Sequence, residues 1–286
     1  MLLTTALASL IAVAPATLRR ALEARIAAVP GAEVSLVYRP LDGKGAPLEL
    51  RGGVLFHAAS TMKLPVLLEL FRRAEQGALS LDQPLLLVNR FQSIVDGSDY
   101  ALSPADDSDA ELYQRIGAAV PLRELAERMI TRSSNLATNA LVGLLGAARI
   151  QQTARALGAK TIEIRRGVED QKAFDRGLTN RTSARDLAAL LEAIEAGRAA
   201  SPAGCRAVLA ILRAQQFNEE IPAGLPPHTK VAHKTGSIHA TLHDAAIVYP
   251  EGAPPYILVV LTRAIPDERV ARALIADLSR LVYAAR

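Results

Sequence analysis

Apolar and polar positions along this chain repeat with a helical period in some stretches and with the two-residue period of strands in others. Helical spacing runs through residues 17–29 and ends at Pro30-Gly31, so we expect a helix there with Thr17 as its N-cap. Residues 33–39 alternate as a strand does, and after a glycine-containing turn residues 48–50 begin a second strand. The start of the chain therefore predicts a helix followed by a β-hairpin.

The middle of the chain is mainly helical in its periodicity. Predicted helices span residues 60–75, 122–129, 136–145, 147–157, 183–192 and 202–212, and Thr182 or Ser183 caps the helix at 183. Residues 160–180 are the least regular stretch. Residues 79–109 lack a helical pattern and carry aspartate clusters, among them Asp106-Asp107-Ser108-Asp109. We interpret these clusters as solvated acidic loops, because the spacing of a calcium-binding loop is missing.

The C-terminal part returns to strands. Residues 231–237, 245–249 and 256–263 each have strand character, and the polar stretch 238–243 links the first two. Residues 267–285 have the spacing of a closing amphipathic helix. This order predicts an α+β fold. One lobe of sheet and helix comes from both chain ends, about 17–59 and 205–286, and an all-helical lobe, about 60–204, is inserted between them.

Composition is consistent with a single domain over residues 17–286. Hydrophobic residues make up 50% of the chain and charged residues 22%, which allows a sizeable core and is not a disordered composition. The net charge is +4, but lysine and arginine are scattered, so no nucleic-acid partner is indicated. Because Cys205 is the single cysteine, an intramolecular disulfide and a cysteine metal site are excluded, and we expect a small buried residue there.

The first residues look like an export signal. Met1 to Ala16 is rich in Leu, Ala, Ile and Val and ends in small residues, as does an h-region followed by a cleavage site. No Lys or Arg precedes the apolar run, so an apolar helix of the mature protein is the alternative. We expect export to the periplasm or the extracellular space. No other apolar run is long enough to span a membrane, so stable membrane insertion is not expected.

Candidate chemistry begins at Ser60-Thr61-Met62-Lys63, directly before a long apolar run. In a helix that begins near Ser60, the serine and Lys63 lie at i and i+3 on one face. A serine hydroxyl needs a base within hydrogen-bond reach to act as a nucleophile at neutral pH, and a partly desolvated lysine can be that base. The amides of a helix N-terminus favour an oxyanion at the same place. The alternative is a lysine at the start of an ordinary amphipathic helix.

Two further motifs follow in order. Ser133-Ser134-Asn135 reads Ser-x-Asn, and Lys234-Thr235-Gly236 reads Lys-Thr-Gly. Each alone would pass for a helix cap or for a strand that ends at a glycine. Together with Ser60-x-x-Lys63 they form the motif set of class A β-lactamases and penicillin-binding proteins. The chain resembles a class A β-lactamase-like serine hydrolase from about Thr17 to its C-terminus.

The resemblance implies a fold and a set of catalytic roles. The fold would be an antiparallel sheet flanked by the terminal helices and packed against a helical lobe, with the site in the cleft between them. Ser60 would attack the carbonyl of a β-lactam or of a D-Ala-D-Ala peptide, with Lys63 as base or relay. Ser133 would pass a proton to the leaving nitrogen. The backbone amides of Ser60 and Ser237 would form the oxyanion hole.

The resemblance also implies the residues that bind the substrate. Asn135 would hold both Lys63 and the amide of the substrate side chain. Lys234 would attract the substrate carboxylate, and Thr235 would add a hydroxyl to that carboxylate site. Gly236 would leave room for an acyl group along its strand. No metal or organic cofactor is implied.

Two departures from the family pattern stand out. Ser134 occupies the position where the β-lactamases usually carry an aspartate that is structural in the family. The β-lactamases also hydrolyse their acyl-enzyme with a glutamate in a loop that reads Arg-x-Glu-x-x-x-Asn. In the corresponding stretch, residues 165–180, no glutamate lies two residues after Arg165 or Arg166. Glu169, three residues after Arg166, is the best candidate for this base, with Asp170 behind it. The alternative is that both acids lie on the surface of the loop.

Three histidines cluster around the Lys-Thr-Gly motif, namely His233, His239 and His243. On a strand and a turn, their spacing does not bring them to one face, so we do not expect a zinc site. His233 is expected to flank the site or to pack under it.

The favoured interpretation is an exported, monomeric serine β-lactamase that opens β-lactam rings by hydrolysis through an acyl-enzyme on Ser60. The changed loop around Glu169 keeps open a penicillin-binding-protein-like D,D-peptidase or esterase with slow β-lactam deacylation. A third alternative is a non-turnover β-lactam-binding sensor domain. Each alternative has a small-molecule partner, either a β-lactam or a D-Ala-D-Ala-like peptide, and none involves nucleic acid.

Overall fold

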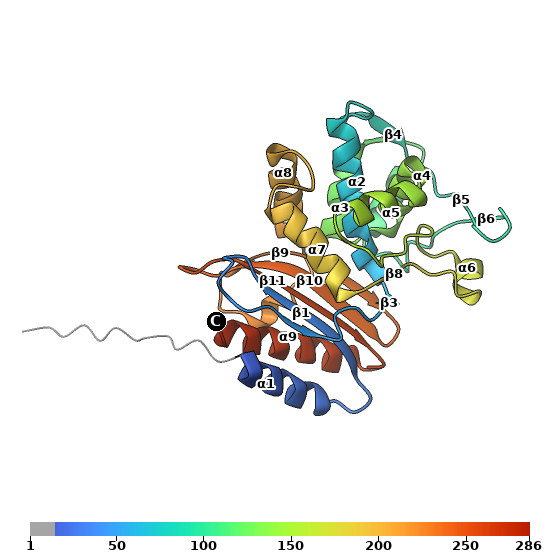
Figure 1. Cartoon of the computed structure of the whole chain (residues 1–286). Helices are drawn as coiled ribbons and strands as arrows, with labels where there is room; N and C mark the ends of the chain where they lie inside the picture. The colour runs from blue at the N-terminus through green and yellow to red at the C-terminus, as the bar shows by residue number, and fades with distance from the viewer. Residues whose placement is uncertain (1–14) are drawn as a thin grey trace, which may run out of the picture.

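A five-stranded antiparallel sheet forms the lower half of the molecule (Figure 1). The computed structural model describes residues 15–286. The strands are β1 (Glu33–Pro40), β2 (Leu48–Leu50), β9 (Lys230–Ile238), β10 (Thr241–Tyr249) and β11 (Tyr256–Arg263), in the order β2-β1-β11-β10-β9. The N-terminal hairpin and the three C-terminal strands therefore share one sheet, with β1 paired to β11 along its whole length.

Helices cover both faces of this sheet. Helices α1 (Pro15–Ala27) and α9 (Glu268–Ala284) lie on one face, and α7 (Ala184–Glu195) and α8 (Pro202–Arg213) lie on the other (Figure 1). The two-residue period of the strands divides the core accordingly, because successive side chains point to opposite faces. In β1, Leu36 packs into the cluster under α1 and α9, whereas Val37 packs into the cluster that reaches the helical lobe.

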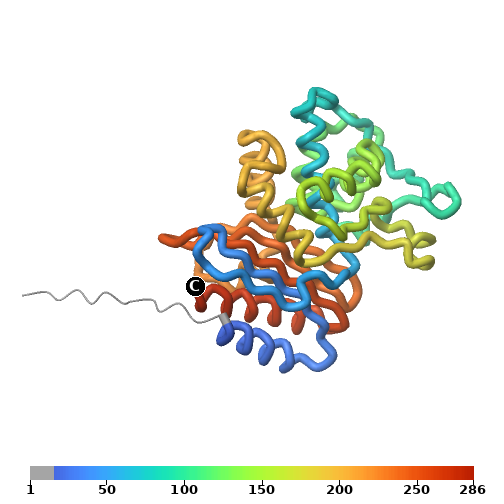
Figure 2. The backbone as a smooth tube through the Cα atoms, in the orientation of Figure 1, coloured from blue at the N-terminus to red at the C-terminus, as the bar shows by residue number. Residues whose placement is uncertain are grey.

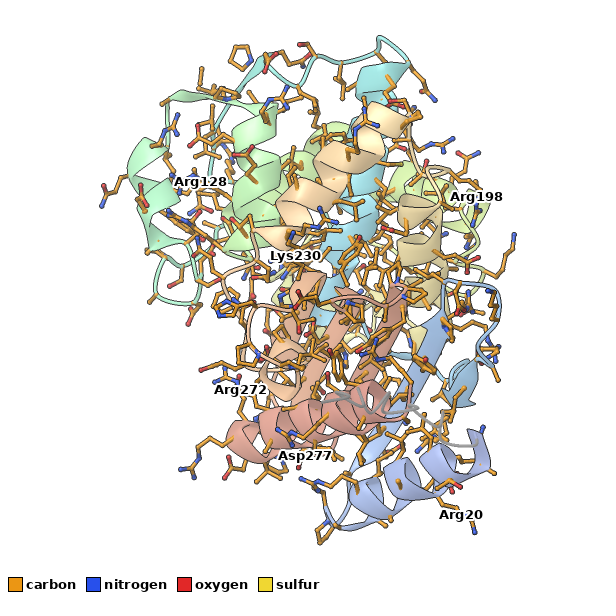
Figure 3. All side chains as sticks on the ribbon, turned by 90° about the vertical axis from the view of Figure 1, so that its left-hand side faces the viewer. Arg20, Arg128, Arg198, Lys230, Arg272 and Asp277 are labelled. Carbon is orange, nitrogen blue, oxygen red and sulfur yellow. The ribbon has the colours of Figure 1, made fainter. Side chains whose placement is uncertain are left out.

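The terminal helices are also joined to each other. They pack side by side, and Arg25 of α1 donates to Asp277 of α9 at 2.7 Å (Asp277 is labelled in Figure 3). Figure 2 shows that the blue and red ends of the chain share one half of the molecule, while the green and yellow middle of the chain forms most of the other.

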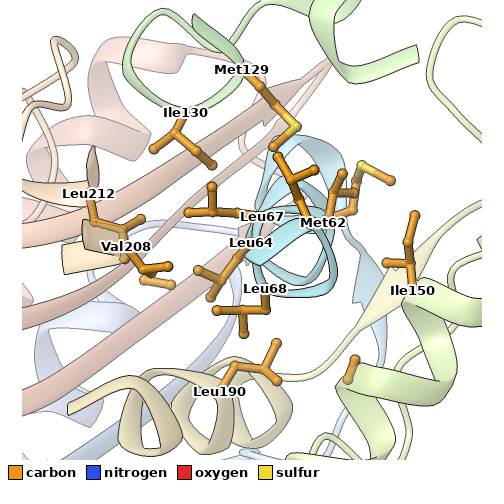
Figure 4. Close-up of a cluster of buried hydrophobic side chains, with 14 of the residues drawn as sticks. Met62, Leu64, Leu67, Leu68, Met129, Ile130, Ile150, Leu190, Val208 and Leu212 are labelled. Carbon is orange, nitrogen blue, oxygen red and sulfur yellow. The ribbon is translucent and has the colours of Figure 1, made fainter. Parts of the chain in front are cut away.

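The helical lobe is built around α2 (Lys63–Glu75). Residues 63–71 of this helix are all buried, as expected for a helix whose apolar side chains surround its axis. Its neighbours are α3 (Leu122–Thr131), α4 (Asn135–Leu145), α5 (Ala147–Ala156) and α8. Figure 4 shows Leu64, Leu67 and Leu68 of α2 surrounded by apolar side chains of α3, α5, α7 and α8.

Short elements complete the fold. The pairs β3–β8 (Phe56–His57, Arg181–Thr182), β4–β7 (Pro84–Leu86, Ala119–Pro121) and β5–β6 (Phe91–Gln92, Asp99–Tyr100) are two-stranded. The 3₁₀ helices are η1 (Ala59–Met62), η2 (Ala110–Arg115) and η3 (Pro222–Gly224), and α6 (Gln171–Asp175) is a single short helix. The pair β3–β8 matters most for the site, because it ties the segment before Ser60 to the irregular stretch that carries Glu169.

The predicted fold class is confirmed, and most predicted elements are found within a few residues of their expected bounds. Ser183 caps α7 in a full capping box with Asp186. Cys205 is buried, with 4% of its surface exposed. In the part of the chain that the structure describes, no helix has both the length and the apolar character needed to cross a membrane. The predicted export segment lies almost entirely outside the described residues.

Three predicted boundaries are wrong. The first helix begins at Pro15, so Thr17 is not its N-cap. The serine helix begins as the 3₁₀ turn η1 and becomes α-helical only at Lys63, in line with the restriction that Pro65 places on the preceding turn. The second C-terminal strand begins at Thr241, and the polar residues His243 and Asp244 belong to β10, where both are fully buried and hydrogen-bonded.

The interpretation of residues 106–109 as a solvated acidic loop holds for Asp106, which is exposed, but is wrong for Asp107 and Asp109. Asp107 and Asp109 have only 8% and 2% of their surfaces exposed. Asp109 forms ion pairs with Arg128 and Arg132 at 2.9 and 3.1 Å, and Asp107 accepts hydrogen bonds from backbone amides of α4. Buried carboxylates need such partners, and the pattern of charges along the chain does not reveal where the partners lie.

Candidate active site

The turn that carries Ser60 is held in an unusual conformation. Ala59, directly before it, has a φ of 45°, in the left-handed region that residues other than glycine rarely adopt. The Ala59 amide donates to Nδ1 of His57 at 3.0 Å, and the Thr61 amide donates to the Ala58 carbonyl at 3.1 Å. Strained backbone of this kind persists only where its surroundings hold it, and it is frequent at functional sites.

Ser60 lies where two cavities meet. One cavity, of about 360 Å³, extends toward residues 166–174, and the other, of about 290 Å³, extends between β9 and α9. Four residues line both cavities: Ser60, Asn135, Glu169 and Ser237. Ser133, Thr235 and Gly236 line the second cavity as well. The structure thus brings residues of all three motifs to one cleft, together with Glu169.

Two buried lysines converge on the hydroxyl of Ser133. Lys63 donates from Nζ to Ser133 Oγ at 3.2 Å and to the Ser133 carbonyl at 2.6 Å. Lys234 donates to the same Oγ at 3.1 Å and to the Thr235 carbonyl at 2.9 Å. Neither lysine has any exposed surface. Ser133 itself has a φ of 56°, so its backbone is also in the left-handed region.

Burial shifts the protonation of both lysines. Burial lowers the pKa of Lys63 well below its usual value, and the charge of Lys234 lowers it further, against the opposing effect of Asp107 and Glu169. Burial also lowers the pKa of Lys234, to about 7, although Asp244 and Glu220 act to raise it. A lysine that loses its proton near neutral pH can act as a base, whereas an ordinary lysine cannot.

Asn135 connects Lys63 to the loop of Glu169. Its Oδ1 accepts from Lys63 Nζ at 2.8 Å, and its Nδ2 donates to Glu169 Oε1 at 3.2 Å. Glu169 has a φ of 60°, and its side chain stays accessible from the cleft. The surrounding protein raises the Glu169 pKa by desolvation, with Asp106 adding to the effect. Glu169 is therefore a cleft carboxylate in contact with Asn135.

The neighbour Asp170 has a different place. It is buried and accepts from Ser93 Oγ at 2.9 Å, from the Ile94 amide at 3.0 Å and from the Ala173 amide at 3.1 Å. The alternative that both acids lie on the loop surface is therefore wrong for Asp170, which caps α6. Its hydrogen bonds fix the loop on the far side of Glu169.

A second asparagine on α4 holds the near side of the same loop. Asn139, one helical turn after Asn135, accepts from the Val168 amide at 2.6 Å and donates to the Val168 carbonyl at 3.0 Å. Gly167 lies so close that a Cβ there would come within 2.2 Å of Asn139 Oδ1. Sequence reasoning did not identify Asn139, although its i+4 spacing from Asn135 was a usable signal.

Strand β9 forms the opposite wall of the cleft. It is an edge strand of the five-stranded sheet and packs against η1. A Cβ on Gly236 would lie 3.0 Å from the backbone nitrogens of Ser60 and Thr61. The glycine is thus required for the close approach of β9 to the serine turn, in addition to the room for substrate that the resemblance implies. Ser237 follows at the exposed end of this strand.

The histidines do not form a metal site. His233 is buried and its Nδ1 lies 3.0 Å from Asp244 Oδ1. His243 Nε2 donates to the His57 carbonyl at 2.9 Å, and burial lowers the pKa of His243 to about 4, so the ring is neutral. His239 lines the first cavity. Across residues 15–286, no group of three His, Cys, Asp or Glu side chains is arranged to hold a metal ion.

The fold, the cleft and its motifs define a class A β-lactamase-like serine hydrolase. The model of the β-lactamase enzyme family matches residues 17–285, and the chain belongs to this family. A β-lactamase of Streptomyces albus G is 28% identical over 252 residues, covering 86% of this chain and 78% of its own length. The carbapenem-hydrolysing β-lactamase KPC of Klebsiella oxytoca is also 28% identical, over 260 residues, covering 86% of this chain and 81% of its own length.

Solved structures agree with this assignment. The structure of PBP-A superposes with a TM-score of 0.80 at 30% identity, and the match covers 94% of this chain and 95% of PBP-A. A mutant of PBP-A, solved as an acyl-enzyme complex with penicillin G, matches with the same TM-score and identity. The chain is therefore similar both to β-lactamases and to PBP-A.

Proposed function

We propose that this protein is a serine β-lactamase that acylates on Ser60 and uses Glu169 to hydrolyse the acyl-enzyme. One observation carries the proposal: Asn135 contacts Lys63 at 2.8 Å and Glu169 at 3.2 Å, beside Ser60. The groups required for two successive proton transfers thus surround one nucleophile. Lys63 lies within hydrogen-bond reach of Asn135 and Ser133, and Ser60 lines the same cleft. A nucleophile accompanied by a base and an orienting group is the arrangement that covalent catalysis uses.

Acylation begins with neutral Lys63, a form that burial favours by lowering the pKa of this lysine. The Ser60 oxygen forms a bond to the β-lactam carbonyl carbon while its proton passes to Lys63 Nζ. The C–N bond of the ring then breaks, and Ser133 donates its hydroxyl proton to the leaving nitrogen. Ser133 recovers a proton from Lys63, with which it shares a hydrogen bond of 3.2 Å. Lys63 is thereby neutral again.

Deacylation is assigned to Glu169. As a carboxylate it takes a proton from a water molecule, whose oxygen forms a bond to the ester carbonyl carbon. The bond from that carbon to the Ser60 oxygen then breaks, and the proton held by Glu169 passes to Ser60, which restores the carboxylate. A carboxylate with a raised pKa is a better base toward water than an ordinary surface acid. General-base assistance of this kind contributes about 10²- to 10⁴-fold in rate.

The substrate is held by the wall formed by β9. Lys234 and Thr235 attract its carboxylate, and the open edge of β9 pairs with its acyl amide, as an added strand would. The amides of Ser60 and Ser237 receive the oxyanion. The close approach of Gly236 to the Ser60 nitrogen supports this assignment, since it brings the two amides to one side of the cleft.

A second candidate is a penicillin-binding-protein-type D,D-peptidase with slow β-lactam deacylation. Two observations favour it: the similarity to PBP-A at 30% identity, and the spacing of Glu169 from Arg166, which differs from the β-lactamase pattern. Its substrate would be a peptide that ends in D-Ala-D-Ala. A β-lactam sensor that traps one acyl group without turnover has the same acylation chemistry.

Stopped-flow hydrolysis of nitrocefin, combined with intact-mass analysis, separates these candidates. Sustained turnover that vanishes in Ser60→Ala establishes the β-lactamase. One equivalent of product with a stable mass adduct, together with release of D-Ala from a D-Ala-D-Ala peptide, establishes the peptidase instead. An adduct without turnover of either substrate favours the sensor. Absence of both adduct and turnover overturns the proposal that β-lactams are ligands.

Glu169→Gln then tests the base. The variant is expected to acylate at the wild-type rate and to accumulate the acyl-enzyme, with turnover slowed by about 10²- to 10⁴-fold. Asp175→Asn is the matched control, because Asp175 is an exposed acid of the same loop that does not line the cleft. Wild-type deacylation in Glu169→Gln would remove Glu169 from the mechanism.

Export and a monomeric state are parts of the same proposal. Fractionation of cells that express the full chain tests export, with activity in the periplasmic or culture fraction as the expected result. Sedimentation of the purified protein at micromolar concentration tests the monomer.

A further inference from the structure

The carboxylate of Asp107 binds the first backbone amides of helix α4, whose first residue, Asn135, is the last residue of the Ser-x-Asn motif. Its Oδ2 accepts from the amides of Asn135 and Leu136, both at 2.9 Å, and from the Tyr113 hydroxyl at 3.0 Å. Asp107 is 8% exposed. Three donors on one buried carboxylate oxygen make a fixed charge-assisted anchor. Nothing in the proposed proton transfers uses this residue.

The backbone that Asp107 anchors is strained. Ser133 has a φ of 56°, and this conformation turns its carbonyl toward Lys63 Nζ at 2.6 Å. A non-glycine residue in the left-handed region is strained, and this conformation persists only where the surroundings hold it. Asp107 holds the amides of Asn135 and Leu136, and Ser108 holds the residue before Ser133 by donating to the Arg132 carbonyl at 2.6 Å.

The loop of residues 106–109, which carries Asp107, is itself held by hydrogen bonds and ion pairs. Asp109 pairs with Arg128 at 2.9 Å (Arg128 is labelled in Figure 3) and donates its amide to Asp107 Oδ1 at 3.0 Å. Asp107 therefore does not depend on a mobile segment for its position. Its charge also reaches the catalytic lysine, since Asp107 acts to raise the Lys63 pKa.

We propose that Asp107 is a positioning residue that locks Ser133 and Asn135 against Lys63, supplying from a separate loop the carboxylate that this chain lacks at Ser134. The inference rests on the proposed function. Ser134 is too short to reach the loop and instead caps α4 by accepting from the Ala137 amide at 3.3 Å. The negative charge beside the motif thus comes from a residue of the same chain that lies 28 residues before Asn135.

Asp107→Asn and Asp107→Ala test the inference by acylation kinetics across pH. Loss of the anchor is expected to slow acylation on the order of tenfold to a hundredfold, the scale of a misplaced catalytic group. Loss of the Asp107 charge is also expected to lower the Lys63 pKa, because Asp107 acts to raise it. The other charges that act on this lysine are Lys234, which lowers its pKa, and Glu169, which raises it. The acid limb of the pH profile of the acylation rate is therefore expected to move to lower pH. A merely structural defect would lower the rate without moving this limb.

Asp186→Asn is the matched control. Asp186 is also a buried helix-capping carboxylate, and it accepts from the Thr161 amide at 3.0 Å without lining the cleft. It is expected to lower the melting temperature while leaving the acylation rate and its pH profile as in the wild type. Equal kinetic losses in Asp186→Asn and Asp107→Asn would overturn the inference, as would wild-type kinetics in a folded Asp107→Asn.

Amide hydrogen exchange separates a failure of this inference from a failure of the proposed function. In Asp107→Asn, the Asn135 and Leu136 amides are expected to lose protection relative to the rest of α4. Unchanged protection would overturn the anchor even if the wild type reacts with no β-lactam. A wild type that is not acylated, with the expected loss of protection in Asp107→Asn, would overturn the proposed function and leave the anchor established.

Discussion

Lys234 donates a hydrogen bond to the hydroxyl of Ser133 across 3.1 Å, from a position with no solvent exposure. The ammonium therefore acts directly on the group that is proposed to protonate the leaving nitrogen. Its charge is sustained by Asp244 and Glu220, which lie behind it, against the cost of burial. The balance of these effects predicts where activity is lost at alkaline pH.

The pH profile of kcat/KM is expected to be bell-shaped. On the acid side, activity rises with pH as Lys63 loses its proton and becomes a base. On the alkaline side, activity falls as Lys234 loses its charge, which places this limb near pH 7 in the free enzyme. In Lys234→Arg the guanidinium stays charged, so the alkaline limb is expected to move upward whatever the absolute rate. Nitrocefin hydrolysis between pH 5 and 10 measures both profiles, and an unmoved limb would assign it to another group.

Glu220 is expected to make stability depend on pH. Burial raises its pKa to about 7, with Asp244 adding to the shift, and its Oε2 has no hydrogen-bond partner among residues 15–286. Its folded pKa exceeds the unfolded value of 4.5, so the folded state binds more protons between these values. The stabilisation that protonated Glu220 gives to the folded state is fully present below pH 4.5 and is lost as pH rises through about 7.

Glu220→Gln removes this titration. Relative to the wild type, the variant is expected to gain up to about 3 kcal/mol of unfolding free energy between pH 4.5 and pH 7, and little more above it. Urea unfolding at pH 4.5, 6 and 8 provides the comparison. Glu251→Gln is the control, because Glu251 is exposed and does not act on Glu220. A pH-independent difference between Glu220→Gln and the wild type would contradict the assignment.

Asn139 is expected to govern deacylation more than acylation. Asn139→Ala removes both hydrogen bonds to Val168, the residue before Glu169, so the base loses its position while Ser60 and Lys63 keep theirs. Accumulation of the acyl-enzyme and slower turnover are the expected results, seen as a burst in stopped-flow traces and as a mass adduct. Asn89→Ala removes an equivalent pair of hydrogen bonds, to Leu102, outside the cleft, and should leave turnover intact.

The sequence could predict those parts of the site whose signals are local. Ser60 and Lys63 lie on one turn, and Ser133 lies two residues before Asn135, the first residue of α4, so their spacing alone places each pair together. The joint order of three motifs then predicts a shared cleft. The period of apolar residues likewise predicts most of the helices and the strands of the sheet, because it reports directly on which face is buried.

The parts that escaped prediction depend on partners distant in the sequence. Asp107 looks like a solvated acid until the amides of α4 are seen. His243 and Asp244 look like a polar link until their partners, the His57 carbonyl and His233, are known. Polar residues bury only where a partner exists. A single sequence records the polar residue but not its partner, so burial of polar groups is the point at which pattern reasoning fails.

Gly236 offers a test of how closely β9 must approach the nucleophile. In Gly236→Ala, the new methyl would meet the Ser60 and Thr61 nitrogens at 3.0 Å and Ala59 Cβ at 3.2 Å. Backbone atoms cannot rotate away, so either β9 or η1 must shift, which costs about 1–3 kcal/mol of stability. The shift also separates the two amides of the proposed oxyanion hole, where loss of one donor costs about 10²- to 10³-fold in rate.

Gly143→Ala is the matched control for this change. Gly143 lies within α4, and a Cβ there meets nothing within 4 Å. It is expected to stabilise the protein by about 0.4–1 kcal/mol, through the unfolded chain, without changing acylation. Melting temperatures and nitrocefin kinetics of the two variants measure the contrast. If Gly236→Ala acylates as fast as Gly143→Ala, the oxyanion does not lie between β9 and the Ser60 turn, and its stabilisation would have to come from side chains of the opposite wall.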